Sequence, residues 1–276
     1  MKYSRAYVEI TNICNKNCSF CPKNNRPKRR MTEEEFTVVA KKLRGVTDYI
    51  YYHVMGEPLT HPQLCTFIKI ANGMGFKSAV TTNGSLLGEK GDALIESGVY
   101  KVNISVHSFE DGTKEDYLAY INDCIDFADK ASKNGILTVM RLWNNGHDGG
   151  LNDETLHLMK EKLCGEWKEG SRGYRVRNKL HLEYGERFDW PDMTADNYGN
   201  EVFCYGLKDH FGVLCDGTVI PCCLDHEGDI PLGNIFKENV EDILSGERAM
   251  TMRDGFARRC ATEELCRRCG YARRFK

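Results

Sequence analysis

The chain has 276 residues, of which 38 are Lys or Arg and 40 are Asp or Glu, so its formal charge at pH 7 is −2. With 41% hydrophobic and 28% charged residues, it has the composition of an ordinary soluble protein, which excludes a disordered tail, a collagen-like fibre and a membrane channel. Its thirteen cysteines are the unusual feature.

Strand-like and helix-like segments alternate along the first 190 residues. We expect strands at residues 7–13, 49–55, 77–82, 102–107, 137–143 and 179–184. We expect helices at residues 32–43, 62–74, 86–97, 114–133 and 153–163. Thr32 and Glu35 have the spacing of a capping box at the start of the first helix. Six βα-type repeats predict an α/β protein with a parallel sheet or barrel.

The alternation is interrupted twice. Residues 144–150 and 165–178 are rich in turn residues, and we expect exposed loops there. After about residue 190 we expect a short hairpin turned at Asp216-Gly217 and one helix at residues 240–249, followed by a cysteine-rich end. We therefore predict a barrel at residues 1–190 and a small module at residues 191–276, whose core is too thin to fold without metal.

The cysteine pattern indicates a reducing compartment. The number of cysteines is odd, no secretory signal is visible, and the longest apolar run is far below the ~20 residues that span a membrane. We expect a cytoplasmic chain with no membrane contact and with free thiolates rather than disulfides. Cys65, Cys124 and Cys164 lie singly in helical patterns and are expected to be buried. The others gather at the two ends of the chain, and clustered thiolates bind metal.

The first cluster lies just past the first expected strand, where α/β proteins place their chemistry. Cys14, Cys18 and Cys21 follow a C-x3-C-x2-C spacing, and three thiolates on one loop repel each other unless a cation is bound. Structural zinc needs four ligands, and the next candidate along the chain is only His53. An iron–sulfur cluster with three protein ligands leaves one iron open. A zinc loop remains the alternative.

These three cysteines, with the aromatic Phe20 before the third, resemble the signature of the radical S-adenosylmethionine (SAM) superfamily. The resemblance implies a [4Fe–4S] cluster on Cys14, Cys18 and Cys21, whose open iron chelates SAM. It also implies reductive cleavage of SAM to a 5′-deoxyadenosyl radical. The implied fold is a partial (β/α)6 TIM-like barrel, in agreement with the six repeats.

The same resemblance implies cofactor contacts at the ends of the expected strands, at Gly56, Glu57, Asn83, Ser105 and Arg141. Gly56 and Glu57 are similar to the last two residues of the family's Gly-Gly-Glu motif, whose first glycine is replaced by Met55. Ser105 and Arg141 are similar in position to contacts for the ribose and the carboxylate. For these two, a hydrogen bond inside the barrel and an ordinary salt bridge remain the alternatives.

The second cluster resembles the SPASM/twitch extensions of some radical SAM enzymes. Cys204-x12-Gly217-x4-Cys222 has the hairpin spacing, and a C-x2-C pair follows near the end of the chain. No cysteine follows this pair, which favours the shorter twitch form with one auxiliary [4Fe–4S] cluster that relays electrons. The implied ligands of this cluster are Cys204, Cys222, Cys266 and Cys269. A second auxiliary cluster, or zinc in this module, remains open, and the cysteines left unassigned are Cys215, Cys223 and Cys260.

Two basic runs adjoin the cysteine motifs. Residues 23–30 carry a local charge of about +5, and so do residues 253–276. Such cations would stabilise anionic iron–sulfur clusters, and the alternatives are solvated loops or capture of an anionic substrate such as RNA. With a nearly neutral total charge, nucleic acid is not the favoured partner.

We therefore expect an oxidoreductase-type radical SAM enzyme that removes a hydrogen atom from its substrate. A peptide or protein side chain is favoured over a small molecule. The alternatives are dehydrogenation of a polyol or sugar, RNA modification, and a non-enzymatic iron–sulfur carrier or zinc-organised module. His107 and Glu183 are candidates for facing the substrate, and a flavodoxin or ferredoxin is the expected electron donor.

Overall fold

The computed structural model describes residues 2–275. Its strands are β1 (Arg5–Val8), β2 (Tyr49–Tyr51), β3 (Lys77–Thr82), β4 (Lys101–Ser105), β5 (Leu137–Leu142), β6 (Lys168–Gly170), β7 (Gly173–Arg177), β8 (Leu180–Tyr184), β9 (His210–Val213), β10 (Thr218–Ile220) and β11 (Gly233–Asn234). Its α-helices are α1 (Glu33–Leu43), α2 (Leu64–Gly73), α3 (Leu87–Glu96), α4 (Lys114–Lys133), α5 (Leu151–Lys162), α6 (Val240–Ser245), α7 (Glu247–Ala257) and α8 (Glu264–Arg267). Short 3-10 helices are η1 (Pro58–Thr60), η2 (Val106–Ser108) and η3 (Tyr271–Phe275).

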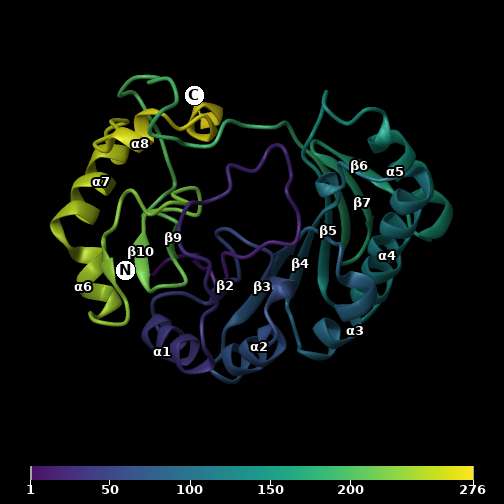
Figure 1. Ribbon diagram of the computed structural model, residues 1–276, viewed down its shortest axis with the longest axis horizontal. Coiled ribbons are helices and arrows are strands. Elements are labelled where there is room, and N and C mark those ends of the chain that lie inside the picture. The colour runs from purple at the N-terminus through teal and green to yellow at the C-terminus, as the bar shows by residue number, and fades with distance from the viewer. Residues whose placement is uncertain (1, 276) are drawn as a thin grey trace.

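All eleven strands belong to one sheet with the order β11-β10-β9-β1-β2-β3-β4-β5-β8-β7-β6. Strands β1 to β5 and β8 are parallel, and β9 joins them in parallel beside β1. The sheet curves into an open barrel, and the helices lie on its outer face (Figure 1). The α/β fold predicted from the repeats and the partial TIM-like barrel implied by the family resemblance are thus confirmed.

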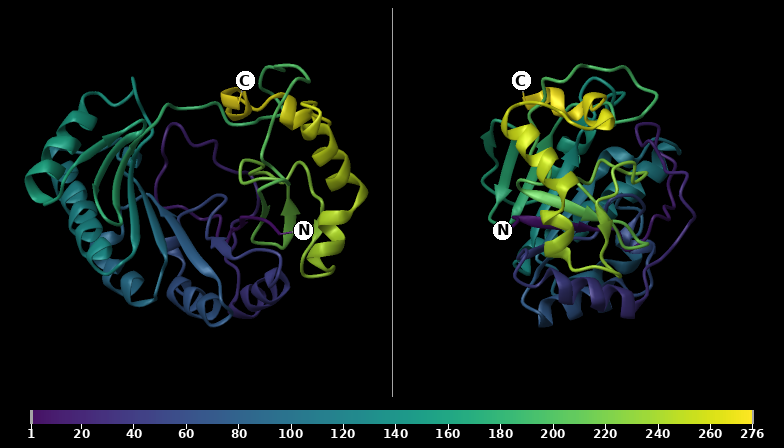
Figure 2. Two further views of the ribbon diagram at one scale, coloured as in Figure 1. Left: turned by 180° about the vertical axis from the view of Figure 1, so that it is seen from behind. Right: turned by 90° about the vertical axis from the view of Figure 1, so that its left-hand side faces the viewer.

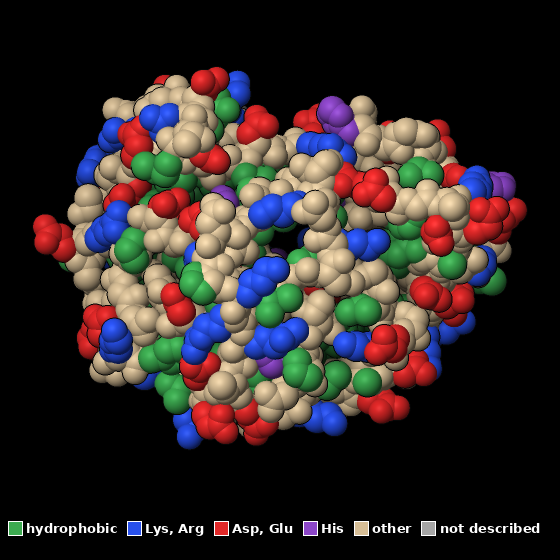
Figure 3. Space-filling view, viewed as in Figure 1, with side chains coloured by type: hydrophobic (Ala, Val, Ile, Leu, Met, Phe, Trp, Pro, Cys, Tyr) green, Lys and Arg blue, Asp and Glu red, His purple; other side chains and the backbone are tan. Residues whose placement is uncertain are grey.

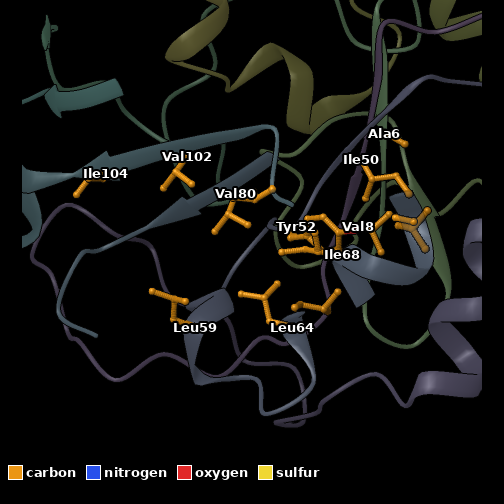
Figure 4. Close-up of a cluster of buried hydrophobic side chains, with 14 of the residues drawn as sticks. Ala6, Val8, Ile50, Tyr52, Leu59, Leu64, Ile68, Val80, Val102 and Ile104 are labelled. Atoms are coloured by element: carbon orange, nitrogen blue, oxygen red, sulfur yellow. The ribbon is translucent and has the colours of Figure 1, made fainter. Parts of the chain in front are cut away.

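Alternation along the strands separates an apolar outer face from a polar inner one. Figure 4 shows Val80 and Val102 pointing to the side on which Leu59 and Leu64 lie, so these side chains join the layer between strands and helices. The opposite face of β4 carries Lys101, Asn103 and Ser105, all of which border an internal cavity. The inside of this barrel is therefore a polar cavity rather than a packed core.

The C-terminal residues continue the sheet. Hairpin β9–β10 lies beside β1, with Val8 opposite Val213, and one hydrophobic cluster includes residues from both parts of the chain. Figure 2 shows α6 and α7 on the outside of this edge, and the green segment that precedes β9 crossing the mouth of the barrel. The boundary near residue 190 stays a prediction. No helix in residues 2–275 has the length and apolarity that crossing a membrane requires.

Several local predictions need correction. Residues 165–178 contain the whole of hairpin β6–β7 instead of an open loop, and the helix expected at residues 240–249 is broken at Gly246 into α6 and α7. The first strand ends at Val8 rather than residue 13, because the chain beyond it leaves β2 and forms a bridge between Thr11 and Arg30. The capping box at Thr32 is confirmed.

Candidate active site

The first cysteine group lies on the long loop between β1 and α1. Cys14 is exposed, and Cys18 and Cys21 are half-buried. Burial raises the pKa of the Cys18 thiol, and the negative charges of Glu110, Cys14 and Cys21 raise it further. The loop therefore brings the three thiols into one electrostatic neighbourhood, at the end of the sheet where the sequence placed them.

Glu57 ties this loop to the ends of the neighbouring strands. Its side chain is 2% exposed and accepts hydrogen bonds from the backbone N–H groups of Leu59 (3.0 Å) and Asn83 (2.6 Å). Its own N–H donates to the carbonyl of Ile13 at 2.9 Å. Burial raises the pKa of Glu57 to about 7. Its carboxylate thus already has backbone partners.

Asn83 lies directly beside the first cysteine. Its Nδ2 is 3.8 Å from the Sγ of Cys14 and 2.9 Å from the Oδ1 of Asn15. Gly56 allows its backbone to approach the backbone of Thr11 closely. It has φ = +77°, and a Cβ at this position would lie 2.4 Å from the carbonyl oxygen of Thr11. The structure therefore gathers Gly56, Glu57 and Asn83 around the loop that carries Cys14.

Ser105 and Arg141 are direct neighbours on β4 and β5, and both line the cavity. The guanidinium of Arg141 lies over the Trp143 ring, with its Cζ 4.5 Å from the ring centroid. Its Nε is 3.8 Å from a carboxylate oxygen of Glu183, beyond hydrogen-bond length, and has no hydrogen-bond partner. Glu183 itself is not among the residues that line the cavity.

His107 lines the cavity between the first cysteine loop and β5. Its ring is 5.0 Å from that of Phe20, and its Nδ1 lies 3.0 Å from the carbonyl oxygen of Arg141. Burial lowers the pKa of His107 to about 4, so the imidazole is neutral near pH 7. A neutral ring can donate or accept one hydrogen bond toward the cavity.

The second cysteine group borders the same cavity. Cys204, Cys222, Cys266 and Cys269 all line it, together with residues at the ends of barrel strands. Burial raises the pKa of Cys222 well above its usual value, and the charges of Cys223 and of the other three cysteines of this group raise it further. Gly206 lies against both Cys204 and Cys222. A Cβ at Gly206 would lie 3.5 Å from the Sγ of Cys204 and 3.5 Å from the Cβ of Cys222.

The three unassigned cysteines have different surroundings. Cys223 lines the cavity, whereas Cys215 is 2% exposed, with its sulfur 4.0 Å from a guanidinium nitrogen of Arg26. Cys260 is exposed beyond the end of α7. Of the cysteines expected to be buried in helical patterns, Cys124 is buried, but Cys65 is half-buried and Cys164 is exposed.

The two cysteine groups fit iron–sulfur clusters better than single zinc ions. In the part of the chain that the structure describes, no three His, Cys, Asp or Glu side chains converge closely enough to hold one metal ion. A structural zinc site requires such convergence of four ligands. Each thiolate of a [4Fe–4S] cluster binds a different iron, so its protein ligands need not converge on one point.

The cavity is bordered by the second cysteine group and by Phe20 of the first cysteine loop, whereas Cys14, Cys18 and Cys21 do not line it, and its volume is about 570 Å³. Sequence reasoning missed part of its lining, namely Arg5, Tyr7, His53, Lys101 and Asn103. The signal was present as polar residues at alternate positions of β1 and β4. Figure 3 shows a hollow near the centre of one face, with Lys and Arg side chains at its border.

Two family models match the chain. Residues 8–159 match the model described as the Radical SAM superfamily, and residues 204–270 match SPASM, an iron–sulfur cluster-binding domain. The first match covers more than half of the chain. The radical SAM domain implies SAM and a [4Fe–4S] cluster, and the SPASM domain implies auxiliary iron–sulfur clusters.

Sequence relatives include several proteins named GTP 3′,8-cyclase. That of Alkaliphilus oremlandii is 30% identical over 165 residues, which are 54% of this chain and 49% of that protein. That of Chlorobaculum tepidum is 29% identical over 43% of this chain and 39% of that protein. The chain therefore spans about half the length of these relatives, or less. A probable GTP 3′,8-cyclase of Sulfurisphaera tokodaii is 24% identical over 83% of this chain and 84% of that protein.

Solved structures with the same fold include three proteins of low sequence identity. BtrN in complex with AdoMet and 2-DOIA has a TM-score of 0.64 and 18% identity, over 98% of this chain and 94% of that one. SuiB of Streptococcus suis bound to S-adenosylmethionine has a TM-score of 0.59 and 13% identity, over 98% of this chain and 72% of that one. The protein anSMEcpe with AdoMet and the Cp18Cys peptide has a TM-score of 0.59 and 14% identity, over 95% of this chain and 87% of that one. At these identities the likeness shows the fold alone.

Proposed function

The chain belongs to the radical SAM superfamily and carries a C-terminal SPASM domain, and we propose that it cleaves SAM reductively and removes a hydrogen atom from a substrate bound inside the barrel. The observation that carries this proposal is the cavity, which borders both the ends of barrel strands and the four cysteines of the SPASM domain. Cys14, Cys18 and Cys21 would hold the first cluster, which together with SAM would supply the 5′-deoxyadenosyl radical chemistry needed for this hydrogen removal.

The residues around the first cysteine loop have separate roles in this proposal. Cys14, Cys18 and Cys21 hold the first cluster. Gly56, Glu57 and Asn83 hold the loop against β2 and β3 and form the binding site for the amino group of SAM, supported by their position beside Cys14. The ribose and carboxylate of SAM are contacted by Ser105 and Arg141, which are adjacent on β4 and β5.

The SPASM cysteines have an electron-transfer role in the proposal. Cys204, Cys222, Cys266 and Cys269 would hold one auxiliary [4Fe–4S] cluster of the twitch kind, and this cluster would supply an electron acceptor or donor beside the substrate. Since all four border the cavity, this electron need not cross a layer of backbone. A flavodoxin or ferredoxin supplies electrons from outside.

The substrate class has two candidates. A peptide or protein side chain is supported as substrate by the structures of SuiB with a precursor peptide and of anSMEcpe with the Cp18Cys peptide. BtrN with 2-DOIA supports a small molecule. The cavity of about 570 Å³ lies within the range of roughly 300–1,000 Å³ typical of small-molecule sites and also has to hold part of SAM at Ser105 and Arg141, which favours a small molecule or one side chain over a long peptide segment. In either case His107 contacts the substrate, and Glu183 positions Arg141.

Anaerobic reconstitution with iron and sulfide tests the proposal. We expect about eight irons per chain, as for two [4Fe–4S] clusters, and formation of 5′-deoxyadenosine from SAM that depends on dithionite. The triple variant Cys14→Ala, Cys18→Ala, Cys21→Ala should form none and keep about half of the iron. Cys164→Ala, at an exposed position outside both groups, is the matched control. Cleavage of SAM by the triple variant would contradict the assignment.

A further inference from the structure

Positive charge predominates on the wall of the barrel cavity. Its lining includes two acidic residues, Glu186 and Asp225, and the basic residues Arg5, Lys101, Arg141, Arg172 and Arg187. The two carboxylate oxygens of Asp225 accept the backbone N–H groups of Asp229 (2.8 Å) and Ile230 (3.0 Å), and in the described part of the chain Asp225 forms no ion pair with any of the five basic residues. Glu186 is exposed, so its charge is screened by solvent.

Lys101 is a basic residue at the base of this cavity. It is the first residue of β4, and its side chain points to the same side of the sheet as that of Ser105. Ser105 is four residues further along the strand, a distance of about 13 Å at roughly 3.3 Å per residue. Among residues 2–275, no carboxylate lies within ion-pair distance of its ammonium group. Burial lowers the pKa of Lys101, the positive charges of Arg141 and Arg5 lower it further, and the negative charge of Glu183 opposes this shift.

The neighbouring cations are held in place by aromatic rings. The Cζ of Arg5 lies 5.8 Å from the ring centroid of Tyr51, and that of Arg141 lies 4.5 Å from that of Trp143. Arg5 also pairs with Asp209 through one terminal nitrogen. These contacts fix the guanidinium planes before any ligand binds.

Polar atoms without partners are concentrated in the same place. Over the described part of the chain, eight buried side-chain nitrogen or oxygen atoms have no hydrogen-bond partner, and six of them belong to residues that line this cavity. Four of the six are the Nε of Arg5, the Nε of Arg141, the Nδ1 of His53 and the Oδ1 of Asn103. Because buried polar atoms in proteins nearly always have a partner, such a concentration indicates a site built for a polar ligand.

We propose that the substrate carries an anionic group, a phosphate or a carboxylate, that binds at the base of the barrel to Lys101 and Arg5. Asn103 and His53 hydrogen-bond polar atoms of the substrate next to this group. The proposal rests on the proposed function, since it places the substrate in the cavity that SAM shares. It assigns Lys101 as a residue that determines specificity for a negatively charged substrate.

Binding of simple anions to the reconstituted holoenzyme tests this assignment. SAM is kept at saturation so that the site of its own carboxylate is filled. Inorganic pyrophosphate and malonate are titrated separately by calorimetry, and the two arms distinguish a phosphate site from a carboxylate site. We expect one of them to bind with a stoichiometry near one. Lys101→Gln should weaken that binding at least about tenfold, because a hydrogen bond to a charged group is lost, and Lys101→Arg should retain part of it.

Lys69→Gln, on the exposed surface of α2, removes the same charge outside the barrel and is the matched control. Equal weakening by Lys69→Gln and Lys101→Gln, or no binding of either anion, would overturn the anion site. Formation of 5′-deoxyadenosine by the wild-type enzyme is measured in parallel. If the wild type cleaves SAM but binds neither anion, the proposed function stands and only this inference fails. If the wild type binds an anion through Lys101 but cleaves no SAM, the anion site stands and the proposed function fails.

Discussion

Three histidines of the cavity wall are kept neutral by burial. The pKa of His53 is lowered to about 3, and those of His107 and His210 are each lowered to about 4. The unfolded chain, in which a histidine has a pKa near 6.5, therefore binds more protons than the folded protein between about pH 4 and 6.5. The free energy of unfolding should fall as the pH falls through this window.

The variant His210→Gln should lose less of its free energy of unfolding as the pH falls. Burial is the largest cause of its low pKa, followed by the positive charge of Arg5, and Asp209 opposes both. Removing the imidazole should diminish the loss of stability between pH 7 and pH 5 by about 1–2 kcal/mol. Urea unfolding at the two pH values, followed by tryptophan fluorescence, measures the difference, with His157→Gln at an exposed position of α5 as the control. An unchanged fall would mean that His210 is protonated in the folded protein at pH 5.

At the scale of elements, one buried carboxylate holds the first cysteine loop. Glu9 is 0% exposed and accepts two hydrogen bonds from the guanidinium of Arg26, at 2.8 and 2.6 Å. It also accepts the backbone N–H groups of Met55 (3.1 Å) and Cys215 (3.3 Å). The Nε of Arg26 donates to the carbonyl of His226 at 2.8 Å. Glu9 and Arg26 therefore join the loop to the end of β2 and to the SPASM domain.

Arg26→Ala should be strongly destabilising, because it leaves the charge of Glu9 buried and unpaired. Loss of one partner of a buried pair costs about 3–5 kcal/mol. Arg30→Ala, at an exposed position of the same loop, should have little effect on the unfolding midpoint. Comparable midpoints for the two variants would show that Arg26 does not hold the loop. Adding Glu9→Gln to Arg26→Ala should recover part of the loss, since no charge is then left in the interior.

Across the whole molecule, the two halves of the chain share one sheet and one hydrophobic cluster. β9 covers the free edge of β1 along four residue pairs, from Arg5 with His210 to Val8 with Val213. Phe211 and Val213 belong to the same cluster as Ala6 and Val8. The SPASM domain is therefore part of the barrel wall and cannot be removed without exposing the first strand.

A chain that ends at residue 190 should consequently fail to fold on its own. The backbone groups of β1 lose their partners on one side, and apolar side chains that pack against Phe211 become exposed. We expect the fragment to aggregate, whereas the full chain should unfold in one cooperative transition. Circular dichroism during heating compares the two. A soluble fragment with its own cooperative transition would support an independent barrel domain.

The sequence predicted the repeats well where a local pattern determines the element. Residues 77–82 and 114–133 have the predicted bounds, because alternation and the caps of a helix are local signals. The parallel pairing of β9 with β1 was missed, since contacts between residues some 200 positions apart leave no periodic signal. Hairpin β6–β7 was missed because its strands are short and its sequence is rich in glycine and charged residues, and so resembles a loop, although Val176 of β7 is buried.

The candidate site was predictable to different degrees. Cysteine spacing predicted both thiol groups, because their chemistry depends on residue type and short separation. The cluster of Lys101, Arg5 and His53 was not predicted, since it forms only when three strands curve toward one interior. The basic run at residues 23–30 is interpreted from the sequence as stabilising anionic clusters, with a solvated loop or an anionic substrate as the alternatives. Within this run, Arg26 pairs with Glu9, Arg29 pairs with Glu35, and Lys23 donates to the carbonyl of Cys18.

A sheet that does not close has two borders that could pair with strands of other molecules. Here both borders are short: β11 has two residues and β6 has three. All three residues of β6 are exposed, and they include Lys168 and Glu169, whose charges oppose docking of an uncharged strand. The open barrel can thus keep a wide mouth for its ligands without offering neighbouring molecules a long template for aggregation.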